Sequence, residues 1–202
     1  MTRVGAGGRA WLVRAGLALW VVAVSLVSSA LLAGHVLTMP APTAVDARLA
    51  QGMGRWQAGQ GRWQALHVLA DGCRCSGRVV EHLLGREPGG AVAEAVVLVS
   101  EGPDEPRRAA ALRTAGYGVE VLSAAGVEAR YGVEAAPLLV VADPSGVVRY
   151  AGGYTDRKQS LVLRDREVMA SLLAGRTPAR LPTYGCAVSA RLRRDLSPWP
   201  LR

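Results

Sequence analysis

Apolar and polar residues divide the chain into a long apolar run near the N-terminus and a part in which short apolar runs alternate with helix-like periodicity. Residues 15–34 carry no Asp, Glu, Lys or Arg, and about 20 apolar residues are enough to cross a bilayer as a helix. Arg3, Arg9 and Arg14 precede this run and fewer basic residues follow it, which predicts a cytoplasmic N-terminus. We therefore predict a membrane anchor over residues 1–39.

The same run admits a second interpretation, because Ser28, Ser29 and Ala30 form a small-x-small pattern typical of signal-peptide cleavage. The run is long for the core of a signal peptide, which favours an uncleaved anchor. Both interpretations export the rest of the chain. We expect a single-pass protein of the bacterial inner membrane whose folded part lies in the periplasm. Residues 40–61, which contain several Pro and Gly, are expected to form a linker.

Beyond the expected linker, strand-length apolar runs alternate with segments of helical periodicity. The predicted strands cover residues 63–70, 93–100, 119–122, 138–142 and 147–151. The predicted helices cover residues 76–86, 105–115, 124–131 and 165–174. This order predicts an α/β domain over residues 62–176, a three-layer sandwich with a mixed sheet that ends in a hairpin. Residues 177–202 would form a C-terminal extension.

The formal charge of +8 suggests a nucleic-acid partner, but the distribution of the charge argues against one. Lys158 is the only lysine among 24 basic residues, and the arginines are scattered along the chain rather than gathered on one predicted helix. No nucleic-acid-binding motif accompanies them. We therefore predict no nucleic-acid partner, and the sequence leaves the oligomeric state open.

Two of the three cysteines, Cys73 and Cys75, lie where an apolar strand turns into a helix. A helix N-terminus offers free N–H groups and a positive partial charge, which favour a thiolate over a thiol. Arg74 lies between them and would stabilise a Cys73 thiolate. Cys73 is then the attacking thiol and Cys75 the resolving thiol of a redox pair. The alternative is that both cysteines are ordinary buried thiols.

Three features follow one another along residues 63–174. The cysteine corner follows the first core strand, the step from Ala136 to Pro137 precedes an apolar strand, and a turn that begins at Asp143 and ends at Gly146 opens a hairpin. Together these features resemble the thioredoxin-like superfamily, and more narrowly its exported, membrane-tethered members of the TlpA or RedB type. The resemblance implies a thiol–disulfide oxidoreductase that acts on protein thiols and disulfides and uses no cofactor.

The family motif has two residues between its cysteines, whereas this chain has one. Cys73 overlays the first family cysteine and Ser76 the second in the register that we favour; in the other register Cys75 takes the first position. In the favoured register, His67 falls at the buried acidic residue behind the thioredoxin site. His67 is then either a core histidine with a hydrogen-bond partner or the proton acceptor of the resolving thiol.

The resemblance also implies roles for Ala136, Pro137 and Cys186. In the family the proline bond is cis, the proline packs beside the attacking sulfur, and the backbone before it pairs with an extended substrate chain. A trans proline that starts a strand is the alternative for Pro137. Cys186 follows Tyr-Gly, a motif similar to the Phe-Gly-Cys tail of RedB-like proteins. If the tail folds back, Cys186 pairs with Cys73 or Cys75 as a third redox thiol; otherwise it is a lone packed or free thiol.

Two other function classes compete with the oxidoreductase. The first is a Cu(I)-binding assembly factor that uses Cys73 and Cys75, because thiolates suit this soft ion. Copper-delivery proteins of this fold carry a histidine shortly before the proline, however, and residues 120–137 contain none. We therefore expect no metal under the leading hypothesis. The second class is a non-catalytic adaptor that uses only the peptide groove of the fold.

Overall fold

The computed structural model describes residues 6–57, 61–158 and 160–197. The chain divides into two compact units, Met1–Leu37 and Thr38–Arg202. The first unit contains helix α1, Ala6–Val36. Within α1, the 23 residues of Ala10–Leu32 are long and apolar enough to cross a membrane. The apolar helix predicted from residues 15–34 is therefore present.

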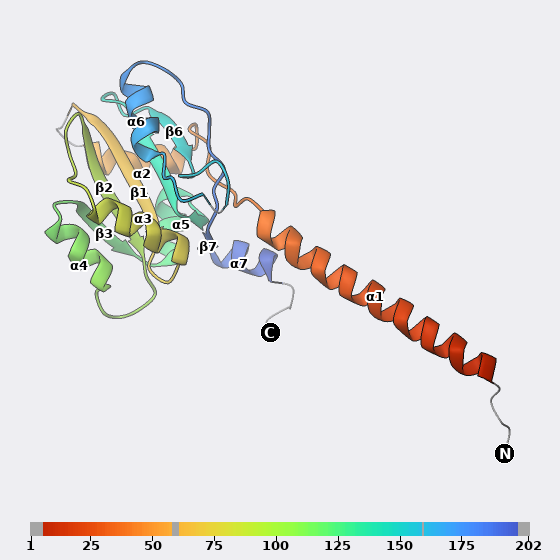
Figure 1. Cartoon of the computed structure of the whole chain (residues 1–202). Coiled ribbons are helices and arrows are strands. Elements are labelled where there is room, and N and C mark those ends of the chain that lie inside the picture. Colours follow the sequence, from red (N-terminus) through yellow and green to blue (C-terminus); the bar gives the residue numbers. More distant parts are fainter. Residues whose placement is uncertain (1–5, 58–60, 159, 198–202) are drawn as a thin grey trace. The chain divides into compact units, whose positions relative to one another are not determined.

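The second unit is built on a mixed sheet with the strand order β3-β2-β1-β5-β6 (Figure 1). The strands are β1 Trp63–Ala70, β2 Val92–Val99, β3 Gly118–Leu122, β5 Leu138–Ala142 and β6 Val148–Gly152. β2 is parallel to β1 and to β3, whereas β5 is antiparallel to β1 and to β6. The predicted mixed sheet with a closing hairpin is confirmed.

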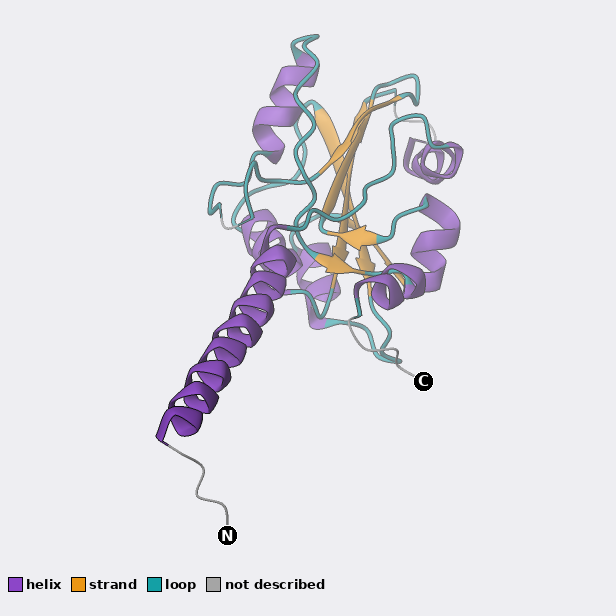
Figure 2. Cartoon of the chain, turned by 90° about the vertical axis from the view of Figure 1, so that its right-hand side faces the viewer, coloured by secondary structure: helices purple, strands orange, loops and turns teal. Residues whose placement is uncertain are grey.

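Helices cover both faces of this sheet, which gives the unit three layers (Figure 2). The helices are α2 Ala47–Gln57, α3 Arg74–Leu84, α4 Arg107–Thr114, α5 Ala124–Tyr131, α6 Asp165–Leu173 and α7 Ala190–Leu196. Successive residues of a strand point to opposite faces. Leu66 and Val68 of β1 belong to a buried cluster with α2 and α5, while Ala65 and Leu69 belong to one with α3, α4 and α6.

Helix α2 corrects the prediction that residues 40–61 form a linker. Leu49 and Met53 are fully buried, and the Trp56 indole N–H donates to the Tyr131 hydroxyl at 3.0 Å. A Cβ on Gly52 would lie 2.3 Å from the Tyr131 ring. The apolar residues form a stripe at helical spacing, and Gly52 lets α2 approach α5 closely. This glycine, which suggested a loop, is therefore a packing position.

The chain after α6 returns to the sheet and forms a second, two-stranded sheet. In it, β4, Ala135–Ala136, is antiparallel to β7, Cys186–Ala187, with Ala136 opposite Cys186. Because β4 comes directly before β5, this pairing brings the tail to the entry of a central strand. The described part of the predicted C-terminal extension, residues 177–197, thus belongs to the same compact unit as the sheet.

Candidate functional site

Cys73 lies at the corner between β1 and α3. It is the N-cap residue of α3, and its carbonyl oxygen accepts a hydrogen bond from the Gly77 amide at 2.9 Å. The Ser76 hydroxyl accepts a hydrogen bond from the Ala70 amide at 3.0 Å, which ties the first turn of α3 to the end of β1. The predicted thiol at a helix N-terminus is present, and it is only 3% exposed.

Cys75 and Cys186 both lie against Cys73, although Cys186 is far along the chain. The β4–β7 pairing sets Cys186 opposite Ala136, and the Ala136 carbonyl oxygen lies 3.9 Å from the Cys73 sulfur. Cys186 and Cys73 line the same cleft, and Cys75 lies in the first turn of α3, directly after the N-cap residue Cys73 and Arg74. All three cysteines are free thiols. The structure therefore brings the predicted redox pair and the tail cysteine together in one thiol cluster: Cys73, Cys75 and Cys186.

The thiol cluster has an asymmetric distribution of protons. Hydrogen bonds from the Cys186 thiol and then the Cys75 thiol hold the pKa of Cys73 far below its ordinary value, and they outweigh burial, which would raise it. The pKa of Cys75 and that of Cys186 are raised, first because each thiol donates to Cys73 and then because neighbouring protein atoms keep some water away from it. The cluster thus favours one thiolate, on Cys73, and two protonated donors.

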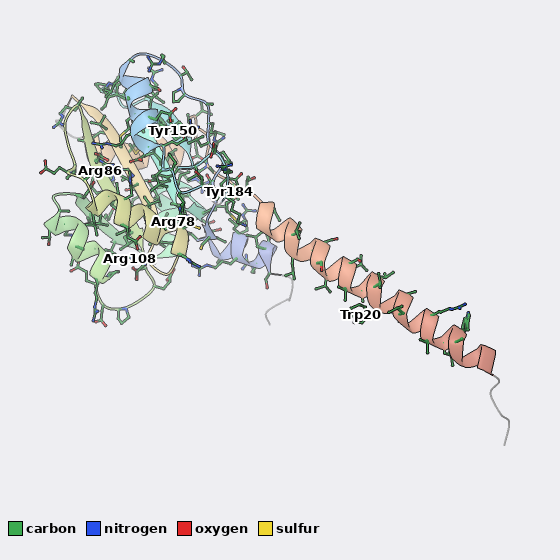
Figure 3. The ribbon with its side chains drawn as sticks, in the orientation of Figure 1. Trp20, Arg78, Arg86, Arg108, Tyr150 and Tyr184 are labelled. Carbon is green, nitrogen blue, oxygen red and sulfur yellow. The ribbon has the colours of Figure 1, made fainter. Side chains whose placement is uncertain are left out.

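Arg74 and Arg108 differ in their relation to this corner. Arg74 has an exposed side chain, and the main causes of the lowered pKa of Cys73 are the two thiols and Ser76; its role in stabilising the thiolate stays a prediction. Arg108, labelled in Figure 3, donates to the Asp71 carbonyl oxygen. A Cβ on Gly77 would lie 2.9 Å from the Arg108 guanidinium. The absence of a side chain at Gly77 therefore leaves room for Arg108, which hydrogen-bonds to the loop before Cys73.

The bond between Ala136 and Pro137 is cis, as predicted. Pro137 lines a small cavity of about 30 Å³ together with Cys75 and Tyr184, which is labelled in Figure 3. A Cβ on Gly185 would lie 1.9 Å from the Ala136 carbonyl oxygen, so only glycine fits there. The Ala136 backbone pairs with the tail of its own chain, and its predicted pairing with a substrate stays a prediction.

His67 is a buried core histidine with two partners. Its Nδ1 lies 2.7 Å from the Tyr154 hydroxyl, and its Nε2 lies 3.1 Å from a carboxylate oxygen of Glu94. Tyr154 lines the same small cavity as Cys75. Tyr154 therefore stands between the histidine and the side of the cluster that holds Cys75. The role of His67 as proton acceptor stays a prediction.

Glu94 belongs to a set of buried charges around His67 that the sequence analysis missed. Burial alone would raise the pKa of Glu94, but hydrogen bonds from Arg86 and His67 lower it to about 2. Arg86 also donates to Asp165 at 3.0 Å, and His82 lies 2.9 Å from the other oxygen of that carboxylate. The sequence feature that could have revealed this set is Glu94 itself, the one carboxylate in the otherwise apolar strand β2, because a buried charge requires a partner.

A cleft of about 490 Å³ opens beside the thiol cluster. Cys73 and Cys186 both contribute to its lining, with Asp71, Glu101 and Arg193 as its charged residues. The small cavity described above, which Cys75 lines, is a separate space. The cleft thus offers access to two of the three cysteines from one side.

Comparisons with known proteins relate this chain to solved structures by fold alone. No family model matches it, and no curated protein matches it. An uncharacterized conserved protein from Geobacillus kaustophilus is similar in structure, with a TM-score of 0.50, 16% identity, and coverage of 64% of this chain and 77% of that one. A hypothetical protein from Sinorhizobium meliloti 1021 has a TM-score of 0.51, 16% identity, and coverage of 76% and 91%.

Proposed function

We propose that this chain is a thiol–disulfide oxidoreductase that acts on protein cysteines through Cys73, Cys75 and Cys186. One observation carries the proposal: the β4–β7 pairing brings Cys186, far along the chain, to the start of α3, where Cys73 and Cys75 lie. Thiol–disulfide exchange needs a stabilised thiolate and a second thiol nearby. A cysteine that is merely buried in a protein core needs neither a stabilised thiolate nor a neighbouring thiol.

The proposal includes a thioredoxin-like fold and a membrane tether. The strand order, the cysteine corner directly after β1 and the cis bond directly before β5 support the fold. Helix α1 supports the tether, with the N-terminus in the cytoplasm and the sheet-bearing unit in the bacterial periplasm. Disulfides form and persist there, which the chemistry requires.

The reaction transfers two electrons between the cluster and a partner. In the reductive direction, a thiolate of the cluster attacks one sulfur of a partner disulfide, the partner S–S bond breaks, and the other partner sulfur leaves as a thiolate. A second thiolate of the cluster then attacks the cluster sulfur of this mixed disulfide. The partner is released as a dithiol and the cluster keeps a disulfide. The oxidative direction runs the same steps in reverse.

Cu(I) binding is the second candidate, because converging thiols are the donors that this soft ion prefers. Within the described residues, no group of three or more His, Cys, Asp or Glu side chains has the arrangement of a metal site. A non-catalytic adaptor is the third candidate. Cu(I) binding by two cysteines needs two thiolates, whereas this cluster favours one thiolate and two protonated thiols, and an adaptor needs no thiolate. We therefore favour redox exchange.

A glutathione redox series on the full-length protein in detergent tests the proposal. Free thiols are alkylated after each step and mapped by mass spectrometry. We expect two of the three cysteines to be protected together, reversibly, as the ratio of oxidised to reduced glutathione rises. If all three remain open to alkylation at every ratio, the oxidoreductase is rejected and Cu(I) titration decides between the other two functions.

A further inference from the structure

The three cysteines differ in how easily a partner protein can reach them. Cys73 is 3% exposed, Cys75 is partly buried, and Cys186 is exposed. Exchange proceeds by attack of one sulfur on another, so the attacking atom must reach its target directly. A partner that approaches the site can therefore reach Cys186, whereas Cys73 is almost fully buried.

The tail segment around this exposed cysteine, residues 181–189, is named the tail strap here. Before the cysteine, the strap is tied down by backbone hydrogen bonds from Gly153 to the Leu181 oxygen at 3.0 Å and from Met39 to the Thr183 oxygen at 2.8 Å. A Cβ on Gly153 would lie 2.0 Å from the Pro182 carbonyl oxygen. The strap therefore lies directly on the backbone at the end of β6.

After the cysteine, the strap is held by Glu134. The Glu134 carbonyl oxygen accepts hydrogen bonds from the Val188 amide at 2.7 Å and the Ser189 amide at 3.1 Å. The Arg191 guanidinium donates to the Glu134 carboxylate at 2.8 Å. Val188 and Ser189 are buried, and the Ser189 hydroxyl accepts a hydrogen bond from the Leu192 amide. The strap is thus bound on both sides of its cysteine, unlike a loose lid.

We propose that Cys186 is the thiol that contacts the partner, and that the tail strap presents it at the cleft as a fixed part of the site. The cleft of about 490 Å³ is lined by both Cys186 and Cys73, so a partner sulfur that enters it meets the exposed thiol first. This inference rests on the proposed oxidoreductase function. It assigns the partner as a protein with a reduced pair of cysteines.

The geometry suits donation of a disulfide. In the oxidised protein a bond joins Cys73 to Cys186; a partner thiolate attacks the Cys186 sulfur, that bond breaks, and Cys73 leaves as a thiolate. A second partner thiolate attacks the partner sulfur of the mixed disulfide, and Cys186 leaves. The two electrons pass to the Cys73 and Cys186 sulfurs, and the partner's two protons pass to Cys186 and to solvent. A disulfide-bearing oxidant restores the bridge.

The thiolate preference of Cys73 fits the leaving position in this scheme. A thiol of low pKa leaves faster in exchange, and hydrogen bonds from Cys186 and Cys75 lower the pKa of Cys73. A protonated, high-pKa Cys186 is a poor attacking group, but it is an accessible target once oxidised. The three sulfurs thus have separate tasks: a Cys75 thiolate can attack the Cys73 sulfur of the Cys73–Cys186 bridge, which forms a Cys73–Cys75 bridge and releases Cys186 as a thiolate.

Mapping of the first mixed disulfide tests the inference in the unmodified full-length protein. The protein in detergent is oxidised with glutathione disulfide, freed of excess reagent, mixed with a peptide that carries a single cysteine, quenched with acid and digested. We expect the peptide on Cys186, with Cys73 released as a free thiol. A peptide on Cys73 or Cys75 would overturn the inference while leaving the oxidoreductase intact. A protein that forms no disulfide and takes no peptide would reject both.

A substitution gives an independent measurement. Cys186→Ser keeps a hydrogen-bond donor of similar size in the strap, and we expect it to slow oxidation of a dithiol peptide about 100-fold or more. Val45→Ser places the same side chain at a residue that is 90% exposed and outside the cleft, and its rate should equal that of the unmodified protein. A Cys186→Ser variant that is folded by circular dichroism and keeps the full rate overturns the inference.

Discussion

The sheet-bearing unit contains two buried polar clusters with different surroundings, the thiol cluster and a set of charges that we call the ion cluster. The ion cluster consists of His67, Arg86, Glu94, Tyr154, Asp165 and His82. Its carboxylates are paired with arginine or histidine and are almost fully buried. The thiol cluster has one exposed member and a cleft beside it.

This difference indicates that the polar groups of the ion cluster stabilise the fold, whereas those of the thiol cluster are available for chemistry. A charge is costly to bury and needs a fixed partner, so a paired set of charges holds its neighbours in place. A thiol is a small, weakly polar group that is cheap to bury and reactive once it ionises. We therefore expect changes in the ion cluster to affect stability and changes in the thiol cluster to affect exchange.

The largest effect is expected for Cys73→Ser, because two of the three possible disulfides of the cluster share this sulfur. We expect exchange with a dithiol peptide to fall about 1,000-fold or more, with little change in the melting temperature. Stopped-flow measurement of peptide oxidation and a thermal melt check the two halves of this prediction. Retention of exchange through a bridge between Cys75 and Cys186 would show that Cys73 is not the central sulfur.

Glu94→Ala is the corresponding change in the ion cluster. It leaves the Arg86 guanidinium, whose side chain is 8% exposed, without the carboxylate that accepts two of its hydrogen bonds. Breaking a buried ion pair from one side costs about 3–5 kcal/mol, so the free energy of unfolding should fall by that order. Chemical denaturation measures it. The exchange rate per folded molecule should stay unchanged.

Glu87→Ala is the matched control, because it removes the same side chain from an exposed residue close to Arg86 in sequence. A surface substitution of this kind is expected to change stability by less than about 0.5 kcal/mol. If Glu94→Ala is as mild as the control, the ion cluster does not support the fold. If it abolishes exchange in folded protein, the two clusters are not separate.

The elements predicted well from sequence are those whose type and bounds depend only on residues within or next to the element. Strand β1 is buried on both faces and therefore appears as a mostly apolar run, interrupted only by Gln64 and His67. Helix α5 begins after Ser123, whose hydroxyl accepts a hydrogen bond from the Gly126 amide, and ends at Gly132, which has a left-handed φ of 65°. Such caps are local, so the predicted bounds of α5 match the observed ones.

The features missed from sequence depend on contacts between distant residues. The pairing of Cys186 with Ala136 joins segments that β5, β6 and α6 separate in the sequence, and nothing in the local pattern near either residue sets their register. The role of Glu94 depends on Arg86 and His67, which belong to other elements. The sequence therefore predicted the candidate thiols and the proline, while their arrangement required the structure.

The pH dependence of stability provides a third test, with Glu94→Gln as the comparison. The pKa of Glu94 in the folded protein is about 2, below its value of about 4.3 in an unfolded chain. A lowered pKa contributes stability that is present above about pH 4.3 and is lost as pH falls toward about 2. We therefore expect the stability difference between the unmodified protein and Glu94→Gln to shrink over that window, measured by denaturation at each pH. A constant difference would show that the charge of Glu94 is not stabilising.

The smallest expected effect tests Tyr154, a member of the ion cluster that also lines the small cavity beside Cys75. Tyr154 lies 2.7 Å from His67 of the ion cluster and lines the small cavity that also contains Cys75. Tyr154→Phe removes one buried hydrogen bond and should lower the free energy of unfolding by about 1–3 kcal/mol, since the histidine nitrogen loses its partner. If the clusters are independent, the rate at which Cys75 displaces Cys186 from Cys73 stays the same. A slower displacement in folded Tyr154→Phe, with a shifted pH profile, would instead show that protons pass between Cys75 and His67 through this tyrosine, and the ion cluster would then share in the chemistry.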